Sequence, residues 1–516
     1  QAFLVPDLIF NIVAGGALSS AFIPVFTEYM IGRHDEKQAW HIASSALNLA
    51  IALMMVLAGL AILFAPVIVP LYNPGLNPKI PADKAELDLI ISLSRIMFLQ
   101  SILLGGGVIL TSILNAKQDF LRPAIGTVLY NVGLIGGLLP CVFIVADRSA
   151  AHETTAVFLA TWGVVIGAIL QVAAQLPGIV QVKMRYTFSF DYHHPGVIQI
   201  GRQMAPRVLN AAMLYFSTFV DRGLILLMVA GVSQLATNGY ITQYYQAFQL
   251  VLLPLGIFGM AISTAAFPTL AENVTLGRMD RVRAIIQDTL RTILFMSIPS
   301  SVGLIVLGLP IIQVLLQHGA YDLASAESTS IPLAFFAVGL AGLASVEILT
   351  RSFYAMRDSR TPVLISIAQF IFKIALSIIF ILVAINWGLS WGLGALALST
   401  SIAGLLEALV LLWLLHQRVG GLALRSLRVF VERVLLASLA MGVAIFVLRL
   451  LLDLIFSTYH DRLGFGDTLL AFIKLLLELA LGIFVYIRAT RMLGIEDFWQ
   501  QGPVKRVLER LRLSWI

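Results

Sequence analysis

Charged residues are scarce in this chain: Asp, Glu, Lys and Arg make up 12% of its 516 residues, whereas hydrophobic residues make up 59%. A water-soluble domain of this size cannot cover its surface with so few charges. The scarcity therefore excludes a soluble protein and indicates one that lies in a lipid bilayer. Cysteine is scarcer still, because Cys141 stands alone, and this excludes an intrachain disulfide.

Two further absences narrow the class. Alternating strands of about ten residues, which a membrane barrel needs, are lacking. The apolar runs are instead about 20 residues or longer, the length of a helix that crosses about 30 Å of hydrocarbon. The sequence GxxxxGK[ST] does not occur, so nothing indicates a nucleotide-driven pump. The fold predicted is an all-α polytopic membrane protein.

Thirteen apolar spans follow one another, separated by turn sequences such as YNPGLNP and NWGLSWG. The spans fall near residues 3–30, 40–72, 88–115, 123–146, 154–176, 204–231, 235–271, 287–316, 328–355, 361–385, 390–416, 429–453 and 466–488. Loops at alternate ends differ in charge, since one set carries 25 Lys and Arg and the other carries four. The positive-inside rule makes the basic loops and the C-terminus cytoplasmic.

Two segments of the sequence occur twice. ALSSAFIPVFTE at Ala17–Glu28 is matched 244 residues later by AISTAAFPTLAE at Ala261–Glu272. The pattern A-x-x-D-x-x-x-P occurs in NAKQDFLRP and, 239 residues later, in YAMRDSRTP. Repeats of this size in a hydrophobic chain are typical of transporters built from two half-domains. Both helices with the first pair run from outside to inside, so we expect the halves to be parallel.

The repeat also predicts the domain organisation. The second half begins with the span at 204–231, ahead of its repeated segment, and the equivalent helix of the first half would precede residue 1. We therefore expect two parallel six-helix lobes, the first helix being absent here, and two additional C-terminal helices. The domains predicted are an N-terminal lobe at 1–181, a cytoplasmic linker at 182–203, a C-terminal lobe at 204–418, two extra transmembrane helices at 419–494 and an amphipathic cytoplasmic tail at 495–516.

Five segments carry a resemblance to a known family: GGALSSAFIPVF, SILNAKQDFLRPAIGTVLYNVGLIGG, FDYHHPGVIQIGRQMAPRVLNAA, PLGIFGMAISTAAFPTL and LTRSFYAMRDSRTPV. They resemble the MurJ (MviN) lipid II flippases of the MATE-like superfamily. The resemblance implies a two-lobed bundle in the bacterial inner membrane. Its central cavity would move an undecaprenyl-pyrophosphate-linked peptidoglycan precursor to the outer leaflet by alternating access, driven by an ion gradient or the membrane potential.

The resemblance also implies which other molecules are involved. It implies a transporter rather than an enzyme, acting in peptidoglycan synthesis, cell-wall biogenesis and cell shape. We expect no cofactor, no metal and no nucleic acid, and we expect contact with cell-wall synthesis proteins. Two other functions stay open: export of another lipid-linked oligosaccharide or of a drug, and a non-transporting membrane scaffold that kept the fold.

The cavity of the family is implied to hold arginines, but the matching positions here are Phe10 and Gln249. Asn11, Gln246 and Gln249 are therefore the candidate substrate-cavity residues, because amides offer neutral hydrogen bonds. Contacts between helices are the alternative role for these amides. Glu407 is a further candidate for the cavity lining, or else a hydrogen-bonded residue of the core.

Asp221, Arg222 and Lys373 are charged residues that lie inside apolar spans. Such residues are functional candidates in a membrane. At 1.5 Å per residue, Asp221 lies about 21 Å, and Lys373 about 18 Å, from the cytoplasmic ends of their helices. The similar depths predict a buried Asp221–Lys373 ion pair, which serves either as a proton-sensitive coupling switch or as a static pair.

Proline and glycine mark places where helices could bend. Pro254 and Gly256 interrupt the repeated helix of the second half and are hinge candidates, with close helix packing as the alternative. Three successive glycines at 105–107 interrupt another span and have the same two interpretations, a hinge or close helix packing, of which packing is the one expected. His193 and His194 lie in a basic loop, where we expect them to be solvated.

Overall fold

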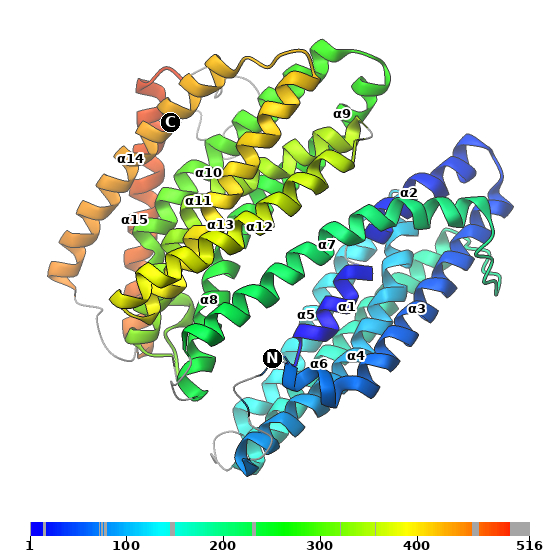
Figure 1. Cartoon of the computed structure of the whole chain (residues 1–516), viewed down its shortest axis with the longest axis horizontal. Coiled ribbons are helices and arrows are strands. Elements are labelled where there is room, and N and C mark those ends of the chain that lie inside the picture. The colour runs from blue at the N-terminus through cyan, green and yellow to red at the C-terminus, as the bar shows by residue number, and fades with distance from the viewer. Residues whose placement is uncertain are drawn as a thin grey trace. The chain divides into compact units, whose positions relative to one another are not determined.

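The computed structural model describes residues 2–13, 17–71, 73, 76, 80–144, 150–229, 234–319, 321–356, 358–456 and 464–495 (Figure 1). Across these residues the secondary structure is helical, and none of them forms a strand. The predicted all-α polytopic fold is thus confirmed. The predicted tail at 495–516 lies outside the described residues from position 496 onward.

The chain divides into two compact units, unit 1 at 1–219 and unit 2 at 220–516. Unit 1 contains α1 (Leu4–Val13), α2 (Ala17–Thr27), a π-helical turn η1 (Glu28–Gly32), α3 (Glu36–Leu71), α4 (Pro81–Ala116), α5 (Leu121–Ile144), α6 (Ala150–Gln181) and most of α7 (Pro195–Met228). The boundary between the units falls within α7, a helix that begins inside the segment predicted as a linker, 182–203.

Unit 2 continues from the end of α7. It contains α8 (Gln234–Pro254), a π-helical segment η3 (Leu255–Ala261), α9 (Ile262–Thr275), α10 (Met279–Leu316), α11 (Leu323–Ala355), α12 (Arg360–Ala384), a short turn η4 (Ile385–Trp387), α13 (Leu389–Arg418), α14 (Leu424–Ile455) and α15 (Phe465–Met492). The thirteen predicted spans fall on these helices of the two units, with α1–α2 and α8–η3–α9 each accounting for one span.

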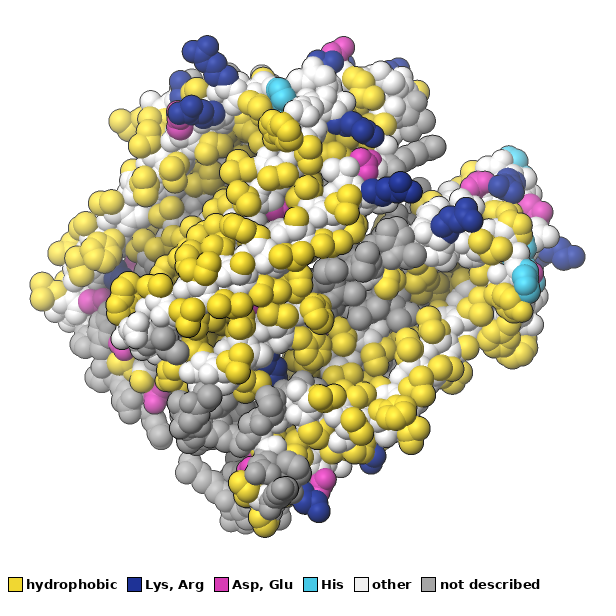
Figure 2. Space-filling view, in the orientation of Figure 1, with side chains coloured by type: hydrophobic (Ala, Val, Ile, Leu, Met, Phe, Trp, Pro, Cys, Tyr) yellow, Lys and Arg dark blue, Asp and Glu magenta, His cyan; other side chains and the backbone are white. Residues whose placement is uncertain are grey.

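Length and hydropathy show which helices can cross a bilayer. Among the described residues, eleven helices are long and apolar enough to do so, and α1, α2 and α7 are not among them. Hydrophobic side chains cover the flanks of the helices in the view of Figure 2, and most Lys and Arg side chains gather toward the helix ends. This distribution is the one expected of helices surrounded by lipid.

The duplicated pattern A-x-x-D-x-x-x-P has the same structural role in both units. Its aspartate precedes the first residue of α5 or α12, where a side-chain oxygen can accept a free backbone N–H of the first turn. Asp358 Oδ1 accepts the N–H groups of Arg360 and Thr361, each at 3.1 Å. Asp119 Oδ1 accepts the N–H of Arg122 at 3.5 Å. The repeat therefore starts equivalent helices.

Glycine controls the tightest helix pair of unit 1. A Cβ atom added to Gly133 of α5 would lie 2.4 Å from Gly167 Cα of α6, and one added to Gly137 would lie 2.5 Å from Gly163 Cα. The backbones can approach this closely because none of the four residues has a side chain, which is the small-xxx-small mode of membrane helix packing. Unit 2 places its close approach elsewhere, between Gly339 of α11 and Ser401 of α13.

The glycines at 105–107 do not break their helix, so they fit the packing interpretation and not the hinge interpretation. α4 runs unbroken from Pro81 to Ala116. Cβ atoms added at the three positions would lie 2.5, 2.9 and 3.1 Å from side-chain atoms of Met54, Ile51 and Val172. Close packing against neighbouring helices therefore explains the glycines.

Candidate functional site

The buried charges of unit 2 meet where α7, α8 and α12 pack together. Lys373 Nζ of α12 donates to Asp221 Oδ2 of α7 at 2.8 Å, and both side chains are less than a tenth exposed. The hydroxyl of Tyr244, on α8, donates to the same carboxylate oxygen at 3.0 Å. One oxygen thus receives an ammonium and a phenol, which compensates the charge that burial would otherwise penalise. Arg222 is buried as well.

Two helices of this site, α8 and α12, carry buried polar atoms that have no hydrogen-bond partner within the ranges that the structure describes. Ser377, one turn beyond Lys373 on α12, is fully buried, and its Oγ has no hydrogen-bond partner in the described part of the chain. The Oε1 atoms of Gln243 and Gln246, on α8, are also buried and have no hydrogen-bond partner among the described residues. Leaving such atoms unpaired in a core is costly. The polar atoms on α8 and α12 are therefore candidate positions for water or for a polar group of a ligand.

The other predicted cavity residues lie on α1, α8 and α13. Asn11 lies on α1 in unit 1, and its Nδ2 donates to the carbonyl of Asp7 at 2.9 Å. Gln249 is exposed on α8. Glu407 of α13 is buried and accepts a hydrogen bond from Ser366 at 2.6 Å. Glu407 thus has the hydrogen bond that its alternative core role requires, and roles of all three in a substrate path stay predictions.

Pro254 and Gly256 lie where α8 changes its hydrogen-bonding pattern. Pro254 ends α8, and the next seven residues form the π-helical segment η3. A Cβ atom at Gly259 would lie 3.1 Å from Ala344 of α11, whereas one at Gly256 would meet nothing within 4 Å. Packing therefore explains Gly259 but not Gly256. The hinge role of Pro254 and Gly256 stays a prediction, at a type of helix irregularity that is frequent at functional sites.

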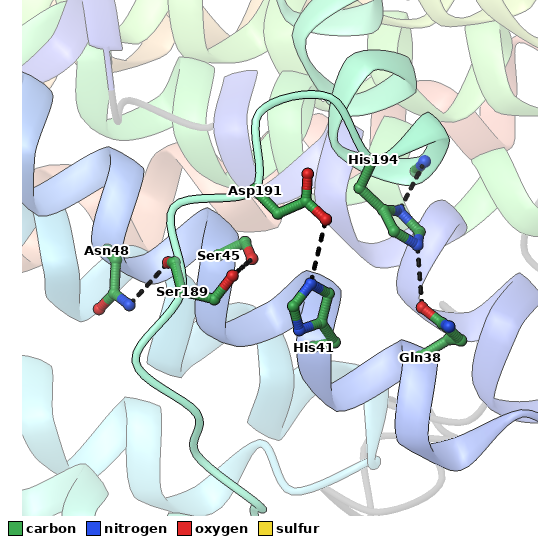
Figure 3. A network of polar contacts seen from close by, with 8 residues as sticks. Gln38, His41, Ser45, Asn48, Ser189, Asp191 and His194 are labelled. Carbon is green, nitrogen blue, oxygen red and sulfur yellow. Dashed lines mark hydrogen bonds and ion pairs between the residues drawn. The ribbon is translucent and has the colours of Figure 1, made fainter.

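A second polar network lies in unit 1 and was not predicted. The segment 182–194, here called the α6–α7 strap, runs without helical structure along the first half of α3 (Figure 3). The contacts are Thr187 N–H to Ser44 Oγ at 3.1 Å, Ser45 Oγ to Ser189 Oγ at 3.0 Å, Asn48 Nδ2 to the Ser189 carbonyl at 2.9 Å and His41 Nε2 to Asp191 Oδ2 at 3.2 Å. Alternate residues of the strap thus bond to polar residues of α3.

His194 belongs to this network, so its prediction as a solvated residue is wrong. Its Nδ1 accepts the N–H of Gly196 at 3.1 Å, and its Nε2 lies 3.0 Å from Gln38 Oε1. This arrangement requires a neutral ring that is protonated on Nε2. Burial lowers the pKa of His194, whereas the hydrogen bond from His41 lowers the pKa of Asp191. His193, by contrast, is exposed as predicted.

A third group of charges holds the last two helices. Lys474 of α15 donates to Asp453 of α14 and, at 3.0 Å, to the carbonyl of Phe456. Arg449 Nη1 of α14 donates to the carbonyl of Val306, on α10, at 2.9 Å. These bonds fasten α14 to α15 and to α10.

The missed networks differ in the signal that the sequence offers. The strap reads RYTFSFDY, in which aromatic and polar residues alternate with the period of an extended chain, and this pattern could have indicated that one face is anchored. Its partners on α3 lie about 140–150 residues away, and no spacing rule connects them. The Lys474–Asp453 pair likewise joins two helices and has no local sequence signature.

Comparisons with known proteins give a consistent result. The family profile described as "Lipid II flippase MurJ" matches residues 1–490. A protein named "Probable lipid II flippase MurJ" from Buchnera aphidicola subsp. Acyrthosiphon pisum is 30% identical over 447 residues, which cover 86% of this chain and 82% of that protein.

Solved structures agree at the level of the fold. A structure titled "Lipid II flippase MurJ, inward closed conformation" matches with a TM-score of 0.69 and 24% identity, covering 97% of this chain and 91% of its own. An inward-facing multidrug resistance MATE family transporter matches with a TM-score of 0.63 and 14% identity, covering 81% of this chain and 89% of its own.

Proposed function

Because this chain belongs to the MurJ family, we propose that it flips lipid II, a lipid-linked peptidoglycan precursor, from the cytoplasmic to the outer leaflet of the bacterial inner membrane. The observation that carries the proposal is the match of the family profile to residues 1–490. Such a substrate needs a protein path, because its charged pyrophosphate and its sugars cannot cross hydrocarbon without a large desolvation cost.

The proposed cycle is alternating access, driven by an ion gradient or the membrane potential. A potential of 100 mV is worth about 2.3 kcal/mol per elementary charge, enough to bias such a cycle. The Asp221–Lys373 pair supports this proposal, since it is a buried, ionisable pair in a helical unit of a transporter family. Asn11, Gln246, Gln249 and Glu407 are proposed to contact the substrate, and Pro254 with Gly256 to provide a bend.

The proposed topology follows from the loop charges. The basic loops, including 182–207, and the C-terminus are proposed to be cytoplasmic. Contacts with cell-wall synthesis proteins are proposed as well, because a flippase supplies their lipid-linked substrate. A drug-export function is not proposed, since the likeness to MATE transporters at 14% identity concerns the fold alone.

Complementation tests the function most directly. The full-length protein should restore growth of a bacterium whose own lipid II flippase is depleted, and lipid II should then become accessible at the outer leaflet. Export of a different lipid-linked oligosaccharide or of a drug, or a scaffold role, would instead give correct membrane insertion without rescue. Insertion without rescue would therefore contradict the proposal.

The coupling role of the ion pair needs a separate measurement. Lys373→Ala should change flipping in proteoliposomes and shift its dependence on pH, because Asp221 would lose its counter-ion. Lys373→Arg is the control, since it keeps the charge. Transport by Lys373→Ala that equals the parent's over a pH series would leave only a static pair.

A further inference from the structure

The α6–α7 strap has a polar face and an aromatic face. Thr187, Ser189 and Asp191 bond to α3. Phe188, Phe190 and Tyr192 come between and after them and are 78%, 44% and 63% exposed. Tyr186 instead joins the polar contacts, because its hydroxyl donates to Asn48 Oδ1 of α3 at 2.9 Å. Side chains of an extended chain point alternately to opposite sides. The strap therefore turns three aromatic rings away from α3.

The level of the strap in unit 1 can be read from neighbouring helices. Lys117, after α4, lies 5.7 Å over the ring of Trp40, which marks the same level on α3. A Cβ atom at Gly178 of α6 would touch Leu114 of α4 and Arg122 of α5, which places these three residues beside one another, about one turn from Lys117. The end of α4, the start of α5 and the end of α6 therefore lie at the same depth as the start of α3.

Apolar side chains that face outward continue to this level. Leu121 of α5 and Val180 of α6 are 70% and 75% exposed, although both lie at the helix ends beside the strap. Ser45 and Asn48, to which Ser189 is bonded, are 5 and 8 residues beyond Trp40, about 8–12 Å further toward the membrane centre. The aromatic face of the strap therefore lies at the depth of the hydrocarbon edge and the headgroups.

Two basic residues precede the aromatic residues of the strap. Lys183 and Arg185 are both exposed. Lys183 has φ 54°, in the left-handed region, and its N–H donates to the Val180 carbonyl at 3.0 Å as α6 ends. This end position usually holds glycine, because other residues are strained there.

We propose that the α6–α7 strap is a binding site for anionic phospholipid. Phe188, Phe190 and Tyr192 insert among the headgroups and upper acyl chains, where aromatic rings are favoured. Lys183 and Arg185 bind the lipid phosphate, each contributing roughly fivefold to the preference for an anionic lipid. The strap at the same time shields Ser44, Ser45 and Asn48 of α3 from lipid, which could not hydrogen-bond to them. In the proposed topology the leaflet is the cytoplasmic one.

The depth of the aromatic face can be measured with spin labels, because the chain has a single cysteine. Cys141→Ser removes it, and Phe188→Cys or Phe190→Cys adds one label in the full-length protein, reconstituted in phosphatidylethanolamine with phosphatidylglycerol. Both labels should collide with oxygen more than with a water-soluble nickel chelate, as should a label at the exposed Val180. A label at the exposed Lys37 is the aqueous control. If the labels at 188 and 190 behave like the one at Lys37, the aromatic face lies in water, where it would bind a soluble protein. That result would overturn the proposal.

The headgroup preference is tested by lipid retention. The parent protein, taken from equal parts of phosphatidylglycerol and phosphatidylcholine, should retain the former preferentially in native mass spectrometry. The double variant K183G/R185Q should reduce this preference by roughly tenfold or more, from about fivefold per basic residue. Its thermal stability should not fall on account of Lys183, since glycine suits the left-handed position.

A matched variant controls for net charge. R278Q/R281Q removes two exposed arginines from unit 2 and changes the total charge by the same amount. It should leave the phosphatidylglycerol preference unchanged. An equal fall in both double variants, or no fall in K183G/R185Q, contradicts a headgroup site on the strap.

Discussion

Unit 1 and unit 2 share the repeat but stabilise their polar residues in different ways. In unit 2 a lysine and an aspartate from two helices neutralise each other in the interior, and a tyrosine from a third helix donates to the aspartate. In unit 1 the polar residues of α3 bond to the non-helical α6–α7 strap at its edge. The duplicated aspartate begins α5 and α12 alike. The comparison teaches that the repeat sets helix starts, whereas residues outside it decide what each unit buries.

Breaking the ion pair of unit 2 should have the largest effect. Lys373→Met leaves Asp221 buried without its counter-ion, and we expect the free energy of unfolding to fall by about 3–5 kcal/mol. The measurement is unfolding of the purified protein in detergent or lipid. The double variant Asp221→Asn with Lys373→Met should recover much of the loss, because it removes both charges. A loss in the double variant that equals the sum of the single losses would show that the two residues are not coupled.

The glycine contact of unit 1 comes next. Gly133→Ala forces a methyl group against the backbone of α6, and we expect a loss of about 1–3 kcal/mol, the usual cost of overpacking. Gly136→Ala, on the same helix, is the control, because its Cβ atom would meet nothing within 4 Å. Thermal unfolding of the two variants side by side provides the measurement. Equal stabilities of the two variants would show that the methyl group at position 133 does not disturb the contact between α5 and α6.

The helix starts offer a direct comparison between the repeats. Asp358→Ala should cost about 1 kcal/mol, because α12 loses an N-cap that accepts two backbone N–H groups. Asp119→Ala should lose less from capping, since its single N–H contact is 3.5 Å long. Asp119 also pairs with Arg122, so Arg122→Gln is needed to separate that pair from the cap. A larger capping loss at Asp119 would reverse the comparison.

Acid should weaken the N-cap that Asp358 forms at the start of α12. Burial acts to raise the pKa of Asp358, but hydrogen bonds from Thr361 and the charge of Arg418 outweigh it and hold the pKa below its usual value. The cap is therefore intact above the unfolded pKa, about 3.9, and is lost as the pH falls through the lower folded value. In Asp358→Ala this part of the acid sensitivity should disappear, as unfolding measured between neutral and acidic pH would reveal.

The smallest effect is expected at His194 of unit 1. Its pKa is lowered by burial, so its contribution is complete above the unfolded value of about 6.5 and is lost as the pH falls below it. Protonation of Nδ1 would break the bond from Gly196 N–H, and the nearby His41 would repel the new charge while Asp191 would attract it. His194→Gln should flatten the stability profile near pH 6, and the exposed His193→Gln should not. An unchanged profile in His194→Gln would contradict this assignment.

Much of the fold could be predicted because apolar length and turn residues act locally. The thirteen spans match helices, and the depth of Asp221 and Lys373 along their own helices was enough to predict that they meet. The partners in packing between distant segments could not be predicted. Close packing was expected at the glycines at 105–107, but their neighbours Met54, Ile51 and Val172 are specified by no sequence spacing.

The candidate site was predictable only in part for the same reason. Lys474 and Glu478 have the i and i+4 spacing of residues that pair along one helix, but Lys474 donates to Asp453 on the neighbouring helix. Glu347 and Arg351, with the same spacing, do form a pair at 3.3 Å. Local rules thus succeed until a partner from another helix offers a better bond.

The contact between α3 and the strap has a consequence for how the protein is made. Asn48 and Ser189 are 141 residues apart, and synthesis proceeds at about 5–20 residues per second, so the helix waits about 7–28 s before its partner exists. During that interval Ser44, Ser45 and Asn48 must be protected by the insertion machinery or by water. The polar stripe of α3 therefore defines a stage in biogenesis at which an unfinished chain is most open to quality control.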